Sequence, residues 1–506
     1  MNLQLGTFSY LMLGFRQAIT PINLAWLTAG GLLGTIIGML PGLGPATGIA
    51  VLIPITYGMN PATALITMAA IYYGAMFGGS RSSIMLNIPG CASSIVTCFD
   101  GYPMTQKGEA GKALATSAIA SFVGGLISVV MMIFLTMPVA NAALKFGPAE
   151  MFSVMLFALT ATVALSQGSI VKGFASLAIG FMLSTIGIDA QTGLQRFTLG
   201  ITELQDGVDF LVVMIGLYAV AEVFRNYSAI DRKYEISTKS IGKVFMTRED
   251  FRKSLMPMLR STPLGFIVGV LPGMGGSIAT MMAYAVEKQI SKHPEEFGKG
   301  AIEGVAAPEA ANNAASSGAM VPLLTMGIPG SGTTAVMLGA LMMLGVRPGP
   351  LLFQQHPEVA WGVIASMIVG NVILIIINLP LVVPLVKLLN IPQRILLPII
   401  MGLAFMGTYP INYSTFDFFL LSLFGLVGYG MSRLDIPIPP LVLALILGSN
   451  TEQSLRRALT IANGNPMTFL QKPISLAFIV LTVLSLVYSF MREAKAKRRH
   501  AGAVAA

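Results

Sequence analysis

Charged residues are scarce in this sequence. Only 10% of its 506 residues are charged and 54% are hydrophobic, which gives a mean hydropathy of +0.76. A soluble domain has about a quarter of its residues charged, so the shortage excludes a soluble enzyme. No stretch is long and polar enough to form a separate soluble domain. Because a helix needs roughly 20 apolar residues to cross the hydrocarbon, we expect an all-α polytopic membrane protein of about 10–14 membrane segments.

Histidine and cysteine are also rare. His293, His356 and His500 are scattered without the spacing of metal ligands. The Gly-rich stretches match neither a phosphate loop nor a dinucleotide fingerprint, since no Lys-Ser/Thr follows them. We therefore expect no enzyme, no ATP-driven transport by this chain alone and no cofactor, with Na⁺ as the one candidate bound ion. A disulfide between Cys91 and Cys98 is an alternative, but two buried small hydrophobic side chains are expected.

The net charge of +9 on its own is compatible with nucleic acid binding. The placement of the charges argues against it, because Lys and Arg gather beside apolar runs at 225–260 and 492–499. Cytoplasmic loops of membrane proteins have this bias. The sequence therefore predicts a multi-pass protein of a bacterial inner membrane, with a basic cytoplasmic linker at 226–260 and a basic cytoplasmic tail.

The N-terminal segment has no Lys or Arg before Arg16 and no cleavage pattern of small residues, so we expect no signal peptide. Its apolar residues recur at helical spacing instead. We interpret residues 1–20 as an amphipathic helix lying in the membrane interface. The apolar positions are Leu5, Phe8, Leu11, Met12, Phe15 and Ile19.

An internal repeat organises the rest of the chain. The segment 38–44 (GMLPGLG) returns at 269–275 (GVLPGMG), and 88–90 (IPG) returns at 328–330. A small polar cluster follows each Ile-Pro-Gly. Two ordered motif pairs indicate duplication, with a first membrane repeat at 21–225, a second at 261–465, and a final span with its tail at 466–506. The polar clusters consist of Ser93, Ser94 and Thr97 in the first repeat and Ser331, Thr333 and Thr334 in the second.

The charges also predict opposite orientations for the two repeats. With the linker and the tail both cytoplasmic, the second repeat begins inside and ends outside near 449–465, which requires an odd number of crossings. A first repeat of the same fold that ends inside must then begin outside. The repeats are therefore expected to be inverted copies. Arg456 and Arg457 conflict with this topology, because they fall on the outer side.

The Leu-Pro-Gly and Ile-Pro-Gly motifs should break helices at membrane depth. Bare backbone groups survive there only inside protein or beside a water-filled cavity, and paired broken segments in inverted halves mark the central site of a transporter. Helix N-termini at such breaks suit carboxylates, and free carbonyls and hydroxyls suit Na⁺. The alternative is that these residues are kinks and close-packing points, but the paired, Ser/Thr-rich arrangement favours a binding site.

The predicted substrate- and ion-binding residues fall into three groups. The residues at the breaks are Pro41, Gly42, Gly44, Thr47, Asn87, Pro89, Gly90, Ser93, Ser94, Pro272, Gly273, Gly275, Pro329, Gly330, Ser331, Thr333 and Thr334. The polar run before the first Ile-Pro-Gly adds Ser80, Arg81, Ser82 and Ser83, and the second repeat adds Glu309, Asn312 and Asn313.

Two of these residues carry charge and have a structural alternative. Arg81 can pair with a substrate carboxylate through its planar guanidinium, or it can reach the interface or an internal partner. Glu309 in apolar surroundings indicates function, whereas a carboxylate in the first turn of a helix is the structural alternative. Asn312 and Asn313 offer both donors and acceptors.

These motifs resemble the large membrane subunit of the tripartite tricarboxylate transporters. The resemblance covers nearly the whole chain, and its most specific stretch is Pro-Glu-Ala-Ala-Asn-Asn at 308–313. Two positions depart from the family pattern: Cys91 stands where an acidic residue is common, and Arg81 where a small polar residue is common. The matching runs are 34–48, 73–103, 297–300, 303–313, 326–331 and 345–350.

The resemblance implies a secondary transporter that imports a citrate-like carboxylate with an Na⁺ or H⁺ gradient. A periplasmic binding protein would deliver the substrate, and a small membrane subunit would accompany this chain. We expect alternating access around a site at the membrane midplane, and we favour a sliding over a rocking movement. The alternatives are a carboxylate permease that works without a binding protein and, from a different class, a channel or membrane scaffold.

Overall fold

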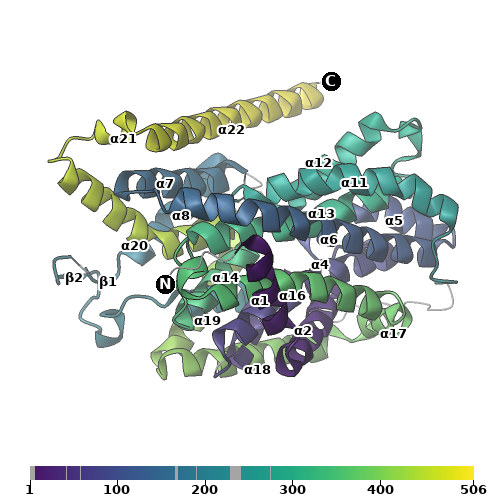
Figure 1. The fold of residues 1–506 in the computed structure, drawn as a ribbon, viewed down its shortest axis with the longest axis horizontal. Helices are drawn as coiled ribbons and strands as arrows, with labels where there is room; N and C mark the ends of the chain where they lie inside the picture. The colour runs from purple at the N-terminus through teal and green to yellow at the C-terminus, as the bar shows by residue number, and fades with distance from the viewer. Residues whose placement is uncertain are drawn as a thin grey trace.

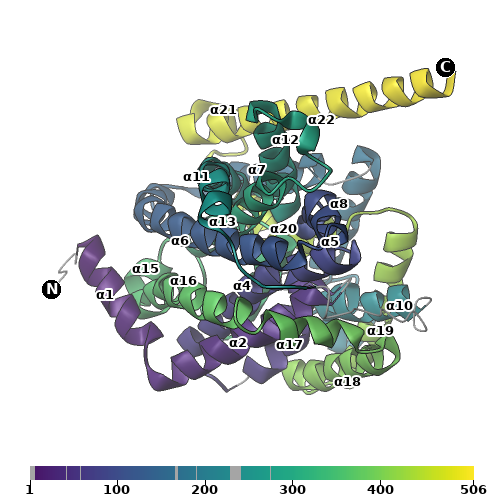
Figure 2. The same ribbon diagram turned by 90° about the vertical axis from the view of Figure 1, so that its right-hand side faces the viewer.

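Helices make up most of the chain that the structure describes (Figures 1 and 2). This computed structural model describes residues 6–40, 43–56, 58–165, 169–189, 191–227, 241–273 and 275–505. In both views α22 lies along one edge of the bundle and α18 lies at the opposite edge. The predicted all-α class is confirmed. The remainder of the described secondary structure is a two-stranded antiparallel hairpin that pairs Gly187 with Arg196 and Ile188 with Gln195.

The first half of the chain supplies ten α-helices, four short 3-10 or π segments and the hairpin within the described residues. They are α1 (Thr7–Ala18), α2 (Pro21–Met39), α3 (Gly44–Leu52), η1 (Ile53–Thr56), α4 (Pro61–Leu86), η2 (Ala92–Ser94), α5 (Thr97–Gln106), α6 (Ala110–Ala143), α7 (Pro148–Leu165), α8 (Ile170–Ser184), β1 (Gly187–Ile188), β2 (Gln195–Arg196), η3 (Thr202–Leu204), α9 (Phe210–Ile215), η4 (Gly216–Val220) and α10 (Ala221–Tyr227).

The second half begins after the basic linker, of which residues 228–240 lie outside the described residues. Its elements are α11 (Arg248–Val270), α12 (Gly275–Ile290), η6 (Pro294–Glu296), α13 (Glu303–Met326), α14 (Gly332–Met343), α15 (Leu352–Gln355), α16 (Pro357–Asn378), α17 (Val382–Lys387), η7 (Leu388–Asn390), α18 (Gln393–Asn412), α19 (Phe416–Arg433), α20 (Ile438–Ile461), α21 (Thr468–Gln471) and α22 (Pro473–Ala505).

Seven helices in the described ranges are long and apolar enough to cross a membrane, which makes this a multi-pass membrane protein. Four shorter apolar helices, α7, α8, α14 and the α3–η1 segment, accompany them. α13 is not among the seven although its central residues are all buried. Its Asn, Ser, Gly and Pro residues lower its hydropathy because it is surrounded by protein instead of lipid. The seven are α2, α4, α6, the continuous segment 210–227, α16, α18 and residues 473–491 of α22.

The same kind of glycine packing holds one helix pair together in each half. An ideal Cβ on Gly38 of α2 would stand 2.2 Å from the Ala75 carbonyl oxygen of α4. A Cβ on Gly269 of α11 would stand 2.2 Å from the Ala315 carbonyl oxygen of α13. Each glycine has another four residues earlier that makes the same kind of contact, so both seams are Gly-x-x-x-Gly interfaces of the kind that lets membrane helices approach closely. The earlier contacts are Gly34 to Ile71 and Gly265 to Ala311.

The two Ile-Pro-Gly motifs end helices in the same way, as the sequence predicts. α4 closes with Asn87 at φ 57° and α13 closes with Gly327 at φ 69°, both in the left-handed region. After each Pro-Gly, an extended residue with a capping box starts a new helical segment, Cys91 before η2 and Ser331 before α14. The local backbone is therefore repeated in the two halves. Pro41 and Gly42, in the first Leu-Pro-Gly, lie outside the described residues.

α4 and α13 pass each other in opposite directions. Near the end of α4, Ser80 accepts a hydrogen bond of 2.7 Å from Ser117, which also contacts Glu309 near the start of α13 at 3.2 Å. Near the middle of α4, the Tyr72 hydroxyl lies 3.4 Å from the hydroxyl of Ser331, just beyond the end of α13. The corresponding helices of the two halves are therefore antiparallel where they meet.

α1 lies against α16 at the N-terminal end of the described chain. Tyr10 stacks on Trp361 with ring centroids 5.9 Å apart, and Gly14 sits directly on the Trp361 backbone. The opposite side of α1 exposes the predicted apolar residues Phe8, Met12 and, just after the helix, Ile19. An amphipathic helix at the membrane interface stays a prediction. Leu5 of the predicted pattern lies outside the described residues.

Both cysteines are buried and neither forms a disulfide. Cys91 caps η2 and lies within contact of the Ser93 hydroxyl, at 3.2 Å. Cys98 is the second residue of α5. The two thiols therefore pack as small buried side chains.

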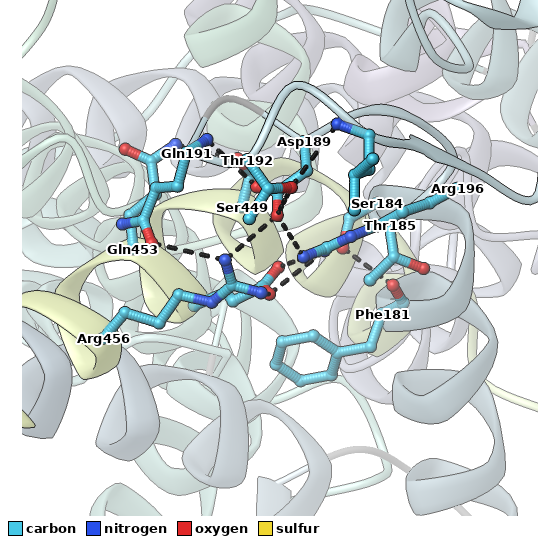
Figure 3. Close-up of polar contacts among 12 residues, drawn as sticks. Phe181, Ser184, Thr185, Asp189, Gln191, Thr192, Arg196, Ser449, Gln453 and Arg456 are labelled. Carbon is cyan, nitrogen blue, oxygen red and sulfur yellow. Dashed lines mark hydrogen bonds and ion pairs between the residues drawn. The ribbon is translucent and has the colours of Figure 1, made fainter. Parts of the chain in front are cut away.

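An ionic network fastens the β1–β2 hairpin to the last turns of α20 (Figure 3). Asp189 lies 2.6 Å from Arg196 and 3.1 Å from Arg456, and Glu452 lies 3.1 Å from Arg196 and 2.5 Å from Arg456. The network has two positive and two negative side chains. Arg456, whose charge conflicted with the predicted topology, is thus paired locally with Asp189 and Glu452.

We predict that Asp189 holds the hairpin in place down to acidic pH. Hydrogen bonds from the Gln191 backbone N–H and the Thr192 hydroxyl, with Arg456 and Arg196 beside them, lower its pKa from 3.8 to about 2. A lowered pKa stabilises the folded hairpin above pH 3.8, and this stabilisation is lost as the pH falls toward 2. Asp189→Asn should therefore increase trypsin cleavage at Arg196 severalfold at pH 7. Asp206→Asn, an exposed aspartate of the same loop, is the control, and equal cleavage of both variants would contradict the anchoring role.

Candidate functional site

A cavity of about 870 Å³ lies where the broken segments of the two halves meet. The first half lines it with the start of α3, the middle of α4 and η2. The second half lines it with the α11–α12 break, α13 and the start of α14. The η4–α10 segment, the α19–α20 connection, α7 and the start of α8 also contribute to its wall. The repeated motifs thus face a common space although they lie more than 200 residues apart.

Nine of the predicted site residues line this cavity. They come from both halves and include the first residues of α3 and α12. They are Gly44, Thr47, Ser93, Gly273, Gly275, Asn312, Pro329, Ser331 and Thr333.

The other predicted residues that the structure describes do not line the cavity. Several of them shape the breaks: the Gly90 N–H donates to the Gly79 carbonyl, and Gly273 N–H donates to the Gly330 carbonyl at 3.1 Å. Pro41 and Gly42 cannot be placed, since they lie outside the described residues. The predicted residues outside the lining are Ser80, Arg81, Ser82, Ser83, Asn87, Pro89, Gly90, Ser94, Pro272, Glu309, Asn313, Gly330 and Thr334.

Asn312 is an unsatisfied polar side chain in the cavity wall. Its residue is 1% exposed, and both its amide nitrogen and its amide oxygen are buried without a hydrogen-bond partner. A buried polar atom left without a partner costs about 1–3 kcal/mol, so native proteins rarely leave both ends of an amide unpaired. A side chain with a free donor and a free acceptor at a cavity is suited to a polar ligand.

Tyr218 faces the cavity from η4, a single turn of π-helix, and sequence reasoning missed it. Its hydroxyl is buried without a partner, and it would lie 2.8 Å from a Cβ on Gly332 at the start of α14. Thr47 of α3 donates to the Tyr218 carbonyl at 3.2 Å. π-Helical turns often occur at functional sites, but nothing in the local sequence marks Tyr218, because its place depends on helices from both halves.

Three helix N-termini meet at the cavity. α3 begins at Gly44, α12 at Gly275 and α14 at Gly332, and residues at each of these starts line the cavity. Gly44 and Gly275 occupy equivalent places in the two halves and both have positive φ, at 52° and 59°. N-termini carry partial positive charge and free N–H groups. Their convergence brings partial positive charge from the backbone to the cavity wall.

The charged side chains among the described lining residues gather near the α19–α20 connection. Lys172 donates to the Leu434 carbonyl at 2.6 Å, and Arg225 forms an ion pair with Glu222. Asp435 is the fourth charged residue of the lining. Asn312, Tyr218 and the lining residues at the three helix N-termini are themselves neutral.

Comparison with known proteins assigns the chain to a protein family. The sequence model of the tripartite tricarboxylate transporter TctA family matches residues 24–443. The chain belongs to this family. The match covers every cavity-lining residue named above, and family membership makes the chain one subunit of a transporter that has other subunits.

Two relatives of this TctA-family chain are proteins of Agrobacterium vitis. One, named "Uncharacterized 52.8 kDa protein in TAR-I ttuC' 3'region", is 43% identical over 490 residues, which is 97% of both chains. The other, named "Uncharacterized protein in TAR-II ttuC' 3'region", is 42% identical over 234 residues, 46% of this chain and 97% of the relative. No solved structure matches the chain.

In this TctA-family protein Arg81 points away from the cavity. Its guanidinium donates to the Phe77 carbonyl at 2.8 Å, to the Asn378 carbonyl at 3.1 Å and to the Asn378 side-chain oxygen. It is 3% exposed. Of the two sequence alternatives, the structure thus shows internal contacts with α4 and α16. Asn378 lies 297 residues from Arg81 in the chain.

Proposed function

We propose that this chain is the large membrane subunit of an ion-coupled secondary transporter that imports a carboxylate across a bacterial inner membrane. A periplasmic binding protein delivers the substrate, and a small membrane subunit accompanies the chain. The observation that carries the proposal is the cavity where Asn312, with both amide atoms unpaired, meets helix N-termini from both halves. Family membership supports the transport role.

The wall of the cavity favours an anion with several oxygens. The N-termini of α3, α12 and α14 offer backbone N–H groups to carboxylates, and the Asn312 amide and the Tyr218 and Thr333 hydroxyls offer further hydrogen bonds. Its volume of about 870 Å³ lies within the range of roughly 300–1,000 Å³ for small-molecule sites. Citrate and smaller di- and tricarboxylates are the substrates we propose.

Neutral recognition suits a substrate that must leave again. A fixed cation would hold a carboxylate tightly, whereas helix dipoles and neutral donors attract it by a smaller amount. Cotransported Na⁺ or H⁺ offsets the negative charge of the substrate, which couples the two movements. If Na⁺ is the cotransported ion, the carbonyls and hydroxyls at the Ile-Pro-Gly breaks are its ligands of choice.

Alternating access follows from the repeat. We infer that the two halves are inverted copies, with the antiparallel passage of α4 and α13 and the repeated local geometry of the breaks in support. In such transporters, one set of elements moves against the other around a fixed site. We favour a sliding movement of the segments that carry the broken helices.

The direct test of this proposal is uptake into proteoliposomes that contain this chain and its small partner. Labelled citrate and shorter carboxylates are offered under an inward Na⁺ or H⁺ gradient, with and without the periplasmic binding protein. We expect uptake that requires both the gradient and the binding protein. Uptake without the binding protein would indicate a stand-alone permease, and substrate-independent conductance without coupled uptake would indicate a channel.

A further inference from the structure

Glu309 lies one turn before Asn312 on α13, in a cluster of hydroxyl groups behind the cavity. It is fully buried, with 0% exposure. The Thr97 hydroxyl of α5 donates to one carboxylate oxygen at 2.5 Å. The hydroxyls of Ser117 and Ser121 of α6 reach the other oxygen, each at 3.2 Å. Three hydroxyls from two other helices therefore converge on a single carboxyl group.

No lysine, arginine or histidine of the described chain forms an ion pair with this carboxyl group. A buried carboxylate without a bonded cation is costly in a protein interior and more so at membrane depth. Such a group is stable only if its charge is offset from a distance or removed by a proton. Hydroxyls serve both states, because each can donate to a carboxylate or rotate to accept from a carboxylic acid.

The titratable groups that face Glu309 come from three elements. Arg81 of α4 interacts electrostatically with Glu309. The described hydrogen bonds of the Arg81 guanidinium, however, are with Phe77 and Asn378. The thiols of Cys91, before η2, and Cys98, in α5, also interact electrostatically with Glu309. From α6 the partners are the hydroxyls of Ser117 and Ser121. Arg81 thus offsets an ionised Glu309 from a distance without fixing it in that state.

The packing of the cluster selects a proton over a metal ion. The oxygens are in direct hydrogen-bond contact, and Ser117 also donates to Ser80 at 2.7 Å. Glu309 does not line the cavity. A metal ion would have to separate these oxygens to bind among them, whereas a proton requires only rotation of the hydroxyls.

The cluster touches the segments that hold the cavity. Thr97 follows η2, whose Ser93 lines the cavity, and Asn312 is one turn along α13 from Glu309. A change of charge on Glu309 alters the Thr97 contact, and with it the contact between α5 and α13. The carboxyl group is therefore placed to link its protonation to the arrangement of the substrate site.

We propose that Glu309 carries the proton that is cotransported with the substrate, an inference that rests on the proposed function. A proton from the outer side forms an O–H bond with the carboxylate of Glu309, which removes its negative charge. After the substrate site turns to the cytoplasm, that bond breaks and the proton leaves on the inner side, restoring the carboxylate. As the carboxyl group gains the proton, one of the three hydroxyls turns from donor to acceptor, and the others can go on donating to the carboxyl oxygens.

The test compares driven uptake with exchange in Glu309→Gln. We expect this variant to lose accumulation under an inward H⁺ gradient while it keeps counterflow of labelled carboxylate within about twofold of the wild type. Counterflow requires only substrate movement and no net proton transfer. Glu303→Gln, at the start of the same helix, is the matched control and should accumulate substrate normally.

Several outcomes would overturn the proposal. Wild-type accumulation by Glu309→Gln would do so, as would accumulation by the wild type that follows a Na⁺ gradient and ignores the H⁺ gradient. A folded Glu309→Gln protein that loses counterflow would make Glu309 a substrate or structural residue. A wild-type protein without counterflow would instead remove the proposed function and this inference with it.

A second variant covers the case in which Glu309→Gln does not fold. Ser121→Ala removes one donor to the ionised carboxylate and so favours its protonated form. Half-maximal H⁺-driven uptake by Ser121→Ala should therefore shift to higher pH than in the wild type, with counterflow retained. An unchanged pH profile would contradict the role of Glu309.

Discussion

Asn312→Ala is expected to abolish measurable carboxylate uptake while the protein inserts and folds normally. Hydrogen bonds to a charged ligand contribute about 1.5–3 kcal/mol each, so losing the amide should weaken substrate binding roughly 10- to 150-fold. In the free protein both amide atoms lack partners. Alanine therefore removes an unsatisfied group, and stability should be unchanged or slightly higher. Uptake in proteoliposomes and thermal unfolding in detergent measure the two effects.

A second buried asparagine provides the control for this experiment. Asn371 of α16 is 2% exposed, and its amide donates to the Met367 carbonyl at 2.8 Å. It lies outside the cavity lining. Asn371→Ala should keep uptake and lower stability, the reverse of the pattern for Asn312→Ala. Wild-type uptake by Asn312→Ala would show that the substrate site lies elsewhere.

Gly269→Ala is expected to cause the largest loss of stability. The added methyl group would meet the Ala315 carbonyl oxygen at 2.2 Å and the Ala315 Cα at 2.6 Å. Both atoms belong to backbone, so α11 and α13 must separate to make room. Overpacking costs about 1–3 kcal/mol and occasionally more, and here it acts at the closest contact of two membrane helices. We expect a clearly lower unfolding temperature and little folded protein in size-exclusion chromatography.

Gly402→Ala is the matched control for the glycine seam. Gly402 lies in α18, and a Cβ built there meets nothing within 4 Å. Since alanine is favoured over glycine in a helix interior by about 1 kcal/mol, this variant should be as stable as the wild type or more so. If Gly269→Ala were equally well tolerated, the close approach of α11 and α13 would not be needed for folding.

Sequence motifs predicted the broken helices because proline and glycine act locally. The helix ends before both Ile-Pro-Gly motifs follow from the missing N–H of Pro89 and Pro329 and from the left-handed residue in front of each. The repeat of these motifs then indicated that they belong to one site. Ser331 could be selected from sequence for that reason, and Asn312 from the polar run at 308–313. Both line the cavity.

Other features depend on contacts between distant parts of the chain. The direction of Arg81 is set by Asn378, and no local pattern near Arg81 reports that partner. Tyr218 faces the cavity only because η4 packs between α3 and α14. The hydroxyl cluster around Glu309 brings together helices whose residues lie about 190–210 positions apart. Such arrangements cannot be derived from spacing along a single helix.

The most direct test of a carboxylate site between the two halves is substrate protection of a thiol in the cavity. Thr333, which lines the cavity, is changed to cysteine in a chain that also carries Cys91→Ser and Cys98→Ala. Serine at position 91 matches Ser331, its counterpart in the second half. Glu203→Cys in the exposed loop before α9 provides the reference thiol. We predict that citrate or a shorter carboxylate slows labelling of Thr333→Cys by a small thiol reagent in a saturable way and leaves Glu203→Cys unaffected. Equal labelling of Thr333→Cys with and without saturating carboxylate would contradict the account.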